Sequence, residues 1–239
     1  MHILVIDGGH VEEEFRAKFG AGHEYIFFST GYHWNSDAEE EGFSREALPV
    51  ADVAFLFGDA GFRLDAHQLL GLFPFPVFHD IGNVALTEFN NLIAELSGRF
   101  RFLGFCGLPT LLNRSLLEVS LYHEADRQKL AETCAALGTD FRVVEDRVGL
   151  VTPRVICMII NEACYTLQEG TASIQDIDLA MKLGTGYPRG PFEWANAIGI
   201  NRVLAVLEAL WDDTHDERYK ICPLLKRQAL RGEPFQIAD

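Results

Sequence analysis

Apolar positions in the first half of the chain fall in short runs, separated by polar stretches in which apolar residues recur three or four positions apart. Short runs bounded by turn residues are typical of strands buried in a parallel sheet, whereas the wider spacing predicts amphipathic helices. We expect strands at residues 2–6, 25–28, 53–57, 77–78, 102–105 and 141–144, helices at residues 12–18, 87–96 and 124–137, and a loop or short helix at residues 31–49. Strands that alternate with helices indicate βαβ units and a Rossmann-like sheet.

The hydrophobic period changes near residues 146–149, and beyond this point the apolar spacing is helical almost throughout. Turns are expected at Gly170, at residues 184–190, at Gly199 and at residues 212–216. We therefore predict an α/β fold in two parts, with a small Rossmann-like parallel-sheet domain at residues 1–146 and an all-α domain at residues 147–239.

Composition and charge narrow the class of protein. Of the 239 residues, 48% are apolar and 23% are charged, which is ordinary for a globular protein. A net charge of −15 argues against a nucleic-acid or anionic-membrane partner, because phosphate binding needs a clustered positive surface. The five cysteines lack C-x-x-C spacing, which indicates buried thiols in a reducing compartment and no disulfide framework or metal site. With neither a basic leader nor a long apolar stretch, the chain is expected to be soluble and cytoplasmic.

The most informative stretch is SIQDIDLAMKLGTGYPRGPFEWANAIG, which spans residues 173–199. Ser173 followed by Asp176 is a helix-capping arrangement, because the hydroxyl accepts from N–H groups of the first turn and the acid favours the helix dipole. Glycines between residues 184 and 190 favour a helix stop and a tight turn, and Pro191 suits the first turn of a new helix. Caps and turns therefore explain most of these residue types.

The order of these residues resembles the start of the C-terminal helical domain of the NAD-dependent 3-hydroxyacyl-CoA dehydrogenases. The matching residues are Asp176-Ile177-Asp178, Ala180-Met181, Gly190-Pro191-Phe192-Glu193, Arg154, Asn161-Glu162-Ala163, Arg218-Tyr219 and Pro223-Leu224-Leu225. Residues 146–151 resemble the linker strand that leads into this domain. The resemblance implies a homodimer that forms through the all-α domain, NAD as the cofactor and an acyl-CoA-like ligand.

The same resemblance implies a Gly-x-Gly-x-x-Gly turn for the dinucleotide at residues 7–12, which read DGGHVE. Gly9 keeps the middle glycine, and Gly9 and Gly8 are the candidate cofactor-binding residues. Asp7 and Glu12 replace the outer two glycines. With the acids at residues 12–14, they place carboxylates where a pyrophosphate would bind, although acids at a helix start also have an ordinary structural explanation. The end of the second strand offers hydroxyls where the family has an acid for the ribose.

Three positions carry the catalytic resemblance. In the family a His, oriented by a Glu, is the base that takes the hydroxyl proton as hydride leaves. Cys106 stands at the His position and Glu118 at the Glu position, while Asn83 is a possible substitute for a polar loop residue. The ordinary pKa of a thiol lies above neutrality. The structural alternatives are that Cys106 is a buried small apolar residue and that Glu118 is a structural or surface acid.

These features lead to one functional hypothesis and its alternatives. We expect a diverged 3-hydroxyacyl-CoA dehydrogenase homologue with lost or much weakened NAD-dependent hydride transfer, acting as a dimeric binding or scaffold protein. One alternative is a working NAD-dependent 3-hydroxyacyl-CoA dehydrogenase with an atypical site, and another is pairing with an active paralogue. His79 and Asp80, which follow a predicted strand end, form the best alternative site.

Overall fold

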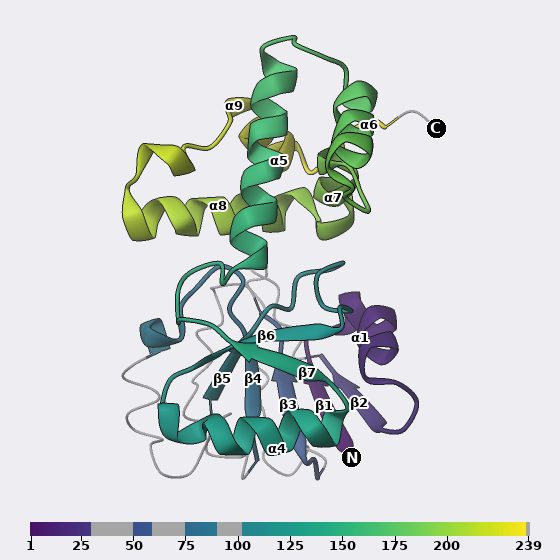
Figure 1. Cartoon of the computed structure of the whole chain (residues 1–239), viewed down its shortest axis with the longest axis vertical. Helices are drawn as coiled ribbons and strands as arrows, with labels where there is room; N and C mark the ends of the chain where they lie inside the picture. Colours follow the sequence, from purple (N-terminus) through teal and green to yellow (C-terminus); the bar gives the residue numbers. More distant parts are fainter. Residues whose placement is uncertain (30–49, 59–74, 90–101, 238–239) are drawn as a thin grey trace, which may run out of the picture. The chain divides into compact units, whose positions relative to one another are not determined.

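The computed structural model describes residues 1–29, 50–58, 75–89 and 102–237 (Figure 1). The loop expected at residues 31–49 and most of the helix expected at residues 87–96 lie outside these ranges. The chain divides into two compact units, one formed by residues 1–107 with 112–150 and the other by residues 108–111 with 151–239.

The first unit is built on a seven-stranded sheet with the strand order β2-β1-β3-β4-β5-β6-β7. The strands are β1 (His2–Ile6), β2 (Glu24–Phe28), β3 (Val53–Leu56), β4 (Val77–Asp80), β5 (Phe102–Phe105), β6 (Leu116–Leu121) and β7 (Asp140–Val143). All neighbouring strands are parallel except β5 and β6. This mainly parallel sheet, together with the helical second unit, confirms the α/β fold predicted from the hydrophobic pattern.

Strand β6 departs from the prediction, because the sequence did not indicate a strand at Leu116–Leu121. Strand β5 is joined to β6 by residues 106–115, which form turns and bends without a helix. A parallel neighbour would need a longer crossover connection, usually a helix, so β6 runs antiparallel to β5.

Aromatic side chains dominate the core of the sheet unit. Phe55 on β3 stacks on Phe78 of β4 with 4.7 Å between ring centroids, and Phe15 meets the Phe55 ring edge-on at 4.9 Å. Phe15 comes from helix α1 (Glu12–Phe19), which follows the short 3-10 helix η1 (Gly9–Val11). Helix α4 (Arg127–Leu137) adds Leu130, Cys134 and Leu137 to the same core. Among the residues that the structure describes, this unit also has the short helices η3 (Leu86–Phe89) and η4 (Glu124–Asp126).

In the second unit, the secondary-structure elements that the structure describes are all helices (Figure 1). It contains α5 (Thr152–Gln168), α6 (Ile174–Thr185), α7 (Pro191–Ile198), α8 (Ile200–Thr214), η5 (Glu217–Tyr219) and α9 (Pro223–Arg231). Gly170, Gly186 and Gly199 have positive φ in the turns between helices, as the sequence predicted. The linker strand implied at residues 146–151 is absent. Gly149 and Leu150, with φ of 76° and 44°, make a turn there instead.

Buried polar side chains fix the connections of the helical unit. The carboxylate of Asp178 on α6 accepts from the backbone N–H groups of Phe192 at 2.8 Å and of Glu193 at 3.0 Å, and so caps the start of α7. The side chain of Asn161 donates to the carbonyl of Lys220 and accepts from the N–H of Cys222. These bonds hold the turn between α6 and α7 and the segment before α9.

The end of the chain also docks on this unit. The amide of Asn196 donates to the carbonyl of Phe235 at 2.9 Å and accepts from its N–H at 2.8 Å, while the Phe235 ring meets Phe192 at 4.8 Å.

Within the described residues, no helix is long and apolar enough to cross a bilayer.

Candidate functional site at the strand ends

The turn after β1 has the backbone shape of a glycine turn without its first glycine. Asp7 adopts φ of 55°, in the left-handed region where glycine is favoured and aspartate is among the tolerated residues. Its N–H donates to the carbonyl of Phe28 at 2.9 Å, which ties the turn to the end of β2. The tight turn is therefore kept, but with a carboxylate-bearing residue at its first position.

The two candidate glycines of this turn have different surroundings. A Cβ added to Gly8 would lie 2.5 Å from Val5 Cγ1 and 2.7 Å from Phe57 Cδ2, whereas one added to Gly9 would have no neighbour within 4 Å. Gly8 thus makes room for core side chains of the protein itself. The space beside Gly9 is open.

Phe57, the last residue of the strand expected at residues 53–57, has a role in this region that the sequence pattern did not indicate. It follows β3 directly, its side chain is fully buried, and its ring meets Phe105 edge-on at 5.3 Å. A Cβ added to Gly107, in the segment after β5, would lie 2.7 Å from Phe57 Cε1. The ring therefore packs against both the turn after β1 and the segment after β5, at the carboxyl ends of the strands where ligands of α/β sheets bind.

The acids at the start of α1 have structural partners. Glu12 pairs with Arg16 one helical turn later at 2.8 Å. Glu14 Oε1 accepts from the N–H groups of Leu112 at 2.9 Å and Asn113 at 2.8 Å, so it fastens the segment after β5 to α1. Glu14 therefore has a structural role that a helix-start preference does not predict. Asp7 and Glu12 nevertheless place carboxylates at the positions of the first and last glycines of the Gly-x-Gly-x-x-Gly turn, and these residues do not fit a pyrophosphate.

Cys106 and Glu118 are brought together by the sheet. The antiparallel register pairs Phe105 with Val119, so the next position along each strand places Cys106 opposite Glu118. Both residues are buried, and Glu118 forms an ion pair with Arg114 at 3.5 Å. The two positions of the expected catalytic pair are therefore neighbours when the register is extended one residue beyond β5, with a thiol where the resemblance implies an imidazole.

His79 and Asp80 are neighbours in the chain, and the His79 ring contacts the main chain of Asp80. His79 Nδ1 lies 2.9 Å from the backbone oxygen of Asp80, and burial lowers the pKa of His79 to about 4 because the interior disfavours the imidazolium. Asp80 Oδ1 accepts from the N–H groups of Gly82 at 3.1 Å and Gly107 at 2.8 Å. Its carboxylate thereby links the bend after β4 to the segment after β5. Asn83 lies half-buried in the following bend.

No group of three or more metal-ligating side chains occurs among the residues whose structure is described. The strand-end region thus combines a glycine-like turn, a buried aromatic ring and a cysteine opposite a glutamate. These groups can position a backbone and exclude water. A general base for a hydroxyl proton would need a side chain that is unprotonated near neutral pH within reach of the reacting oxygen.

Comparisons with known proteins point to one family. Residues 149–236 match the family model of the 3-hydroxyacyl-CoA dehydrogenase C-terminal domain. The 3-hydroxyadipyl-CoA dehydrogenase of Escherichia coli K12 is 47% identical over 93 residues, which are 39% of this chain and 20% of that protein. The 3-hydroxybutyryl-CoA dehydrogenase of Bradyrhizobium diazoefficiens is 40% identical over 159 residues, which are 65% of this chain and 53% of that protein. The chain thus spans about half, or less, of the length of these relatives.

The fold has close counterparts among solved structures. The crystal structure of (S)-3-hydroxybutyryl-CoA dehydrogenase from Ralstonia eutropha aligns with a TM-score of 0.69 and 20% identity, over 97% of this chain and 94% of that chain. At this identity the likeness concerns the fold alone. It spans both the sheet and the helices, whereas the family model matches the helical part.

Proposed function

Because the chain belongs to the 3-hydroxyacyl-CoA dehydrogenase family, we propose that it is a diverged member that has lost NAD-dependent hydride transfer or retains it only weakly. In this proposal it acts as a dimeric binding or scaffold protein. The observation that carries the proposal is the strand-end region, where Asp7 and Glu12 take two of the glycine positions of the expected cofactor turn and Cys106 takes the position expected for the catalytic histidine. Carboxylates repel a dinucleotide pyrophosphate, and losing a general base costs about 10²–10⁴ in rate.

The enzymatic alternative has one observation in its favour. The sheet register pairs Phe105 with Val119, and its extension by one residue brings the Cys106 and Glu118 positions beside each other, which favours a catalytic pair. A working dehydrogenase would have to use Glu118, or a group that Glu118 orients, on the substrate. The two functions therefore differ in what a change at Glu118 does to turnover.

Turnover of 3-hydroxybutyryl-CoA with millimolar NAD, followed as NADH absorbance, separates these functions. The proposal expects no NADH above the level of a heat-inactivated sample, with the Bradyrhizobium relative as a positive control. Turnover that disappears in Glu118→Gln would contradict the proposal and support the enzyme. Turnover that Glu118→Gln leaves unchanged would point to a contaminating dehydrogenase, which repurification would remove.

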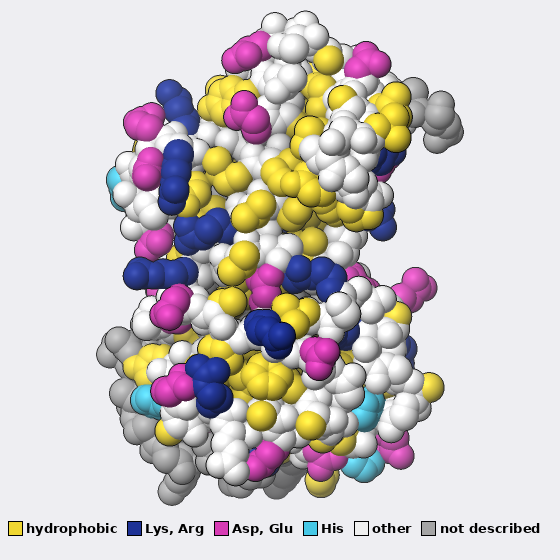
Figure 2. All heavy atoms as spheres, viewed as in Figure 1, with side chains coloured by type: hydrophobic (Ala, Val, Ile, Leu, Met, Phe, Trp, Pro, Cys, Tyr) yellow, Lys and Arg dark blue, Asp and Glu magenta, His cyan; other side chains and the backbone are white. Residues whose placement is uncertain are grey.

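The proposed homodimer would form through helix α6, which packs little of its apolar surface within its own unit. Only Ile177 and Asp178 of this helix are buried, whereas Leu179 and Leu183, one turn apart, are 53% and 78% exposed. On the face of the molecule shown in Figure 2, hydrophobic side chains gather over the helical unit. Exposed apolar side chains at this spacing are typical of a helix face that packs against another protein surface.

The ligand and the compartment complete the proposal. An acyl-CoA-like molecule is the ligand class that the family relationship favours. A reducing compartment, the cytoplasm, is supported by the five cysteines, since all of them are buried thiols.

A further inference from the structure

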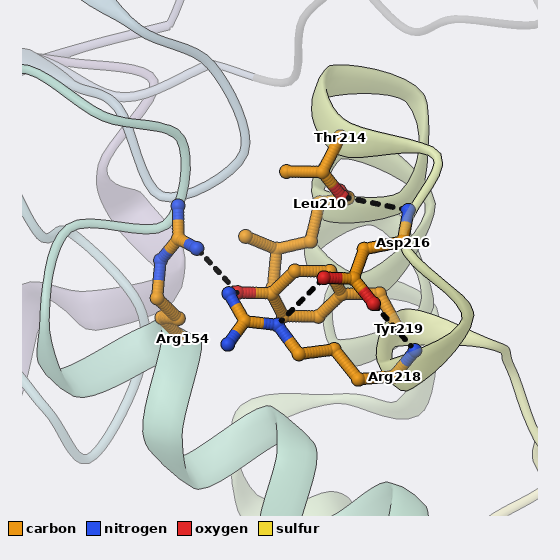
Figure 3. Close-up of polar contacts among 6 residues, drawn as sticks. All are labelled: Arg154, Leu210, Thr214, Asp216, Arg218 and Tyr219. Carbon is orange, nitrogen blue, oxygen red and sulfur yellow. Dashed lines mark hydrogen bonds and ion pairs between the residues drawn. The ribbon is translucent and has the colours of Figure 1, made fainter.

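The helical unit contains a cluster of two arginines and a tyrosine. Arg154 extends from the start of α5, while Arg218 and Tyr219 belong to η5, and Figure 3 shows the three side chains pointing toward one another. Arg154 Nη1 donates to Tyr219 Oη at 2.5 Å, and Arg218 Nη2 donates to the same oxygen at 2.6 Å. Both guanidinium groups also lie against the tyrosine ring, at 5.6 and 4.5 Å from its centroid.

The hydroxyl group at the centre of this cluster has a hydrogen left to donate. A phenol has one O–H donor and two acceptor lone pairs, and the two arginines use both lone pairs of Tyr219. Among the residues whose structure is described, none accepts the Tyr219 hydrogen. Tyr219 is only 3% exposed, and a buried donor without an acceptor is costly. The cluster therefore lacks an acceptor atom at its centre.

Arg218 is the exposed member of this cluster. Its side chain is 64% exposed, its Nε lies 3.5 Å from Asp216 Oδ2, and its Nη2 is bound to Tyr219. Asp216 in turn accepts from the backbone N–H of Arg218, so it orients the segment as well as the guanidinium. The end of α8 is equally fixed, because Thr214 accepts from the N–H of Asp216. These contacts hold both the Arg218 guanidinium and its backbone segment in place.

We propose that Arg154, Arg218 and Tyr219 form a binding site for a phosphate group. A phosphate oxygen would accept the Tyr219 hydrogen, and its other oxygens would accept from the guanidinium groups, whose planar donors match phosphate geometry. The nearby Asp216 and Glu217 oppose anions in general. Binding therefore depends on directed hydrogen bonds, and the net charge of −15 makes unspecific attraction of phosphate unfavourable.

Calorimetric titration with inorganic phosphate, at constant ionic strength and without NAD, tests this site. Wild type is expected to bind phosphate with millimolar affinity. Arg218→Gln should weaken binding about tenfold or more, because it removes charge-assisted hydrogen bonds. Arg227→Gln is the matched control, since Arg227 is an exposed arginine of α9 outside the cluster and the change in charge is the same.

Tyr219→Phe keeps the ring and both arginines but removes the hydroxyl hydrogen, so it should also weaken phosphate binding. If this variant fails to fold, the arginine pair still decides the result. Absence of phosphate binding by wild type overturns the site, and so does equal weakening by Arg218→Gln and Arg227→Gln.

A second titration with coenzyme A distinguishes the source of the phosphate. Binding tighter than that of inorganic phosphate, and reduced by Arg218→Gln, assigns the site to the phosphates of a larger ligand. Equal affinities assign it to free phosphate. Since no cofactor is present, either result is independent of whether NAD binds.

Discussion

The helical unit and the strand ends of the sheet unit differ in how closely their residues resemble the 3-hydroxyacyl-CoA dehydrogenase family. In the helical unit, Asp178, Asn161 and Asn196 bond backbone groups of distant turns, and this unit matches the family model. At the strand ends the fold is kept, while the resemblance implies a glycine at the position of Asp7 and a histidine at the position of Cys106. Here side chains hold the backbone, because Glu14 and Asp80 both accept from N–H groups of the segment after β5.

Among the changes considered, Asp178→Ala in the helical unit is expected to have the largest effect on stability. Asp178→Ala removes two hydrogen bonds at a buried site and leaves the N–H groups of Phe192 and Glu193 without their acceptor. We expect the free energy of unfolding to fall by about 3 kcal/mol, measured by urea denaturation. Asp213→Ala, at an exposed position of α8, is the control and should change it little. Equal stability of the two variants would show that the Asp178 cap does not stabilise the start of α7.

The strand ends should show a dependence of stability on pH. His79 has a folded-state pKa of about 4, below its ordinary value, so the folded state favours the neutral ring. Its contribution is fully present above about pH 6.5 and is lost as the pH falls toward 4, by about 3 kcal/mol in total. His79→Gln removes the titrating group, so the loss between pH 6.5 and 4 should be smaller in the variant. An identical pH profile for both proteins would contradict the assignment.

The two glycines of the turn after β1 provide a matched pair. Gly8→Ala would drive a methyl group into Val5 and Phe57, and we expect it to cost about 1–3 kcal/mol of stability. Gly9→Ala enters open space and should change stability by about 0.5 kcal/mol or less. Thermal unfolding measures both. If Gly9→Ala lowered stability as much as Gly8→Ala, the space beside Gly9 could not be open.

The apolar face of α6 is tested by molecular mass rather than by stability. Leu183→Lys places a charge on the exposed face and should convert a dimer to a monomer, whose mass is 26.8 kDa. Leu230→Lys, at an exposed leucine of α9, is the control and should stay dimeric. Multi-angle light scattering measures the mass. A monomeric wild type would rule out the homodimer, and a dimeric Leu183→Lys would place its interface elsewhere.

The sequence was informative where structure depends on local pattern. The buried runs of β1 and β5 and the glycine turns of the helical unit were predicted because their signals are contiguous. Long-range contacts gave no such signal. The backbone partners of Glu14 lie 98 and 99 residues further along the chain, and Phe57 acquires its role only when β1, β3 and β5 stand in one sheet. The family resemblance suggested the Cys106 and Glu118 positions, but only the antiparallel pairing of β5 with β6 shows that they are neighbours in the sheet.

Calorimetric titration of the purified protein with NAD and NADH tests the central claim most directly. The carboxylates at Asp7 and Glu12 predict no binding at millimolar cofactor, with the Bradyrhizobium relative as a positive control under the same conditions. Micromolar binding of either cofactor would contradict the account. It would show that a turn with acidic outer positions still accepts a dinucleotide.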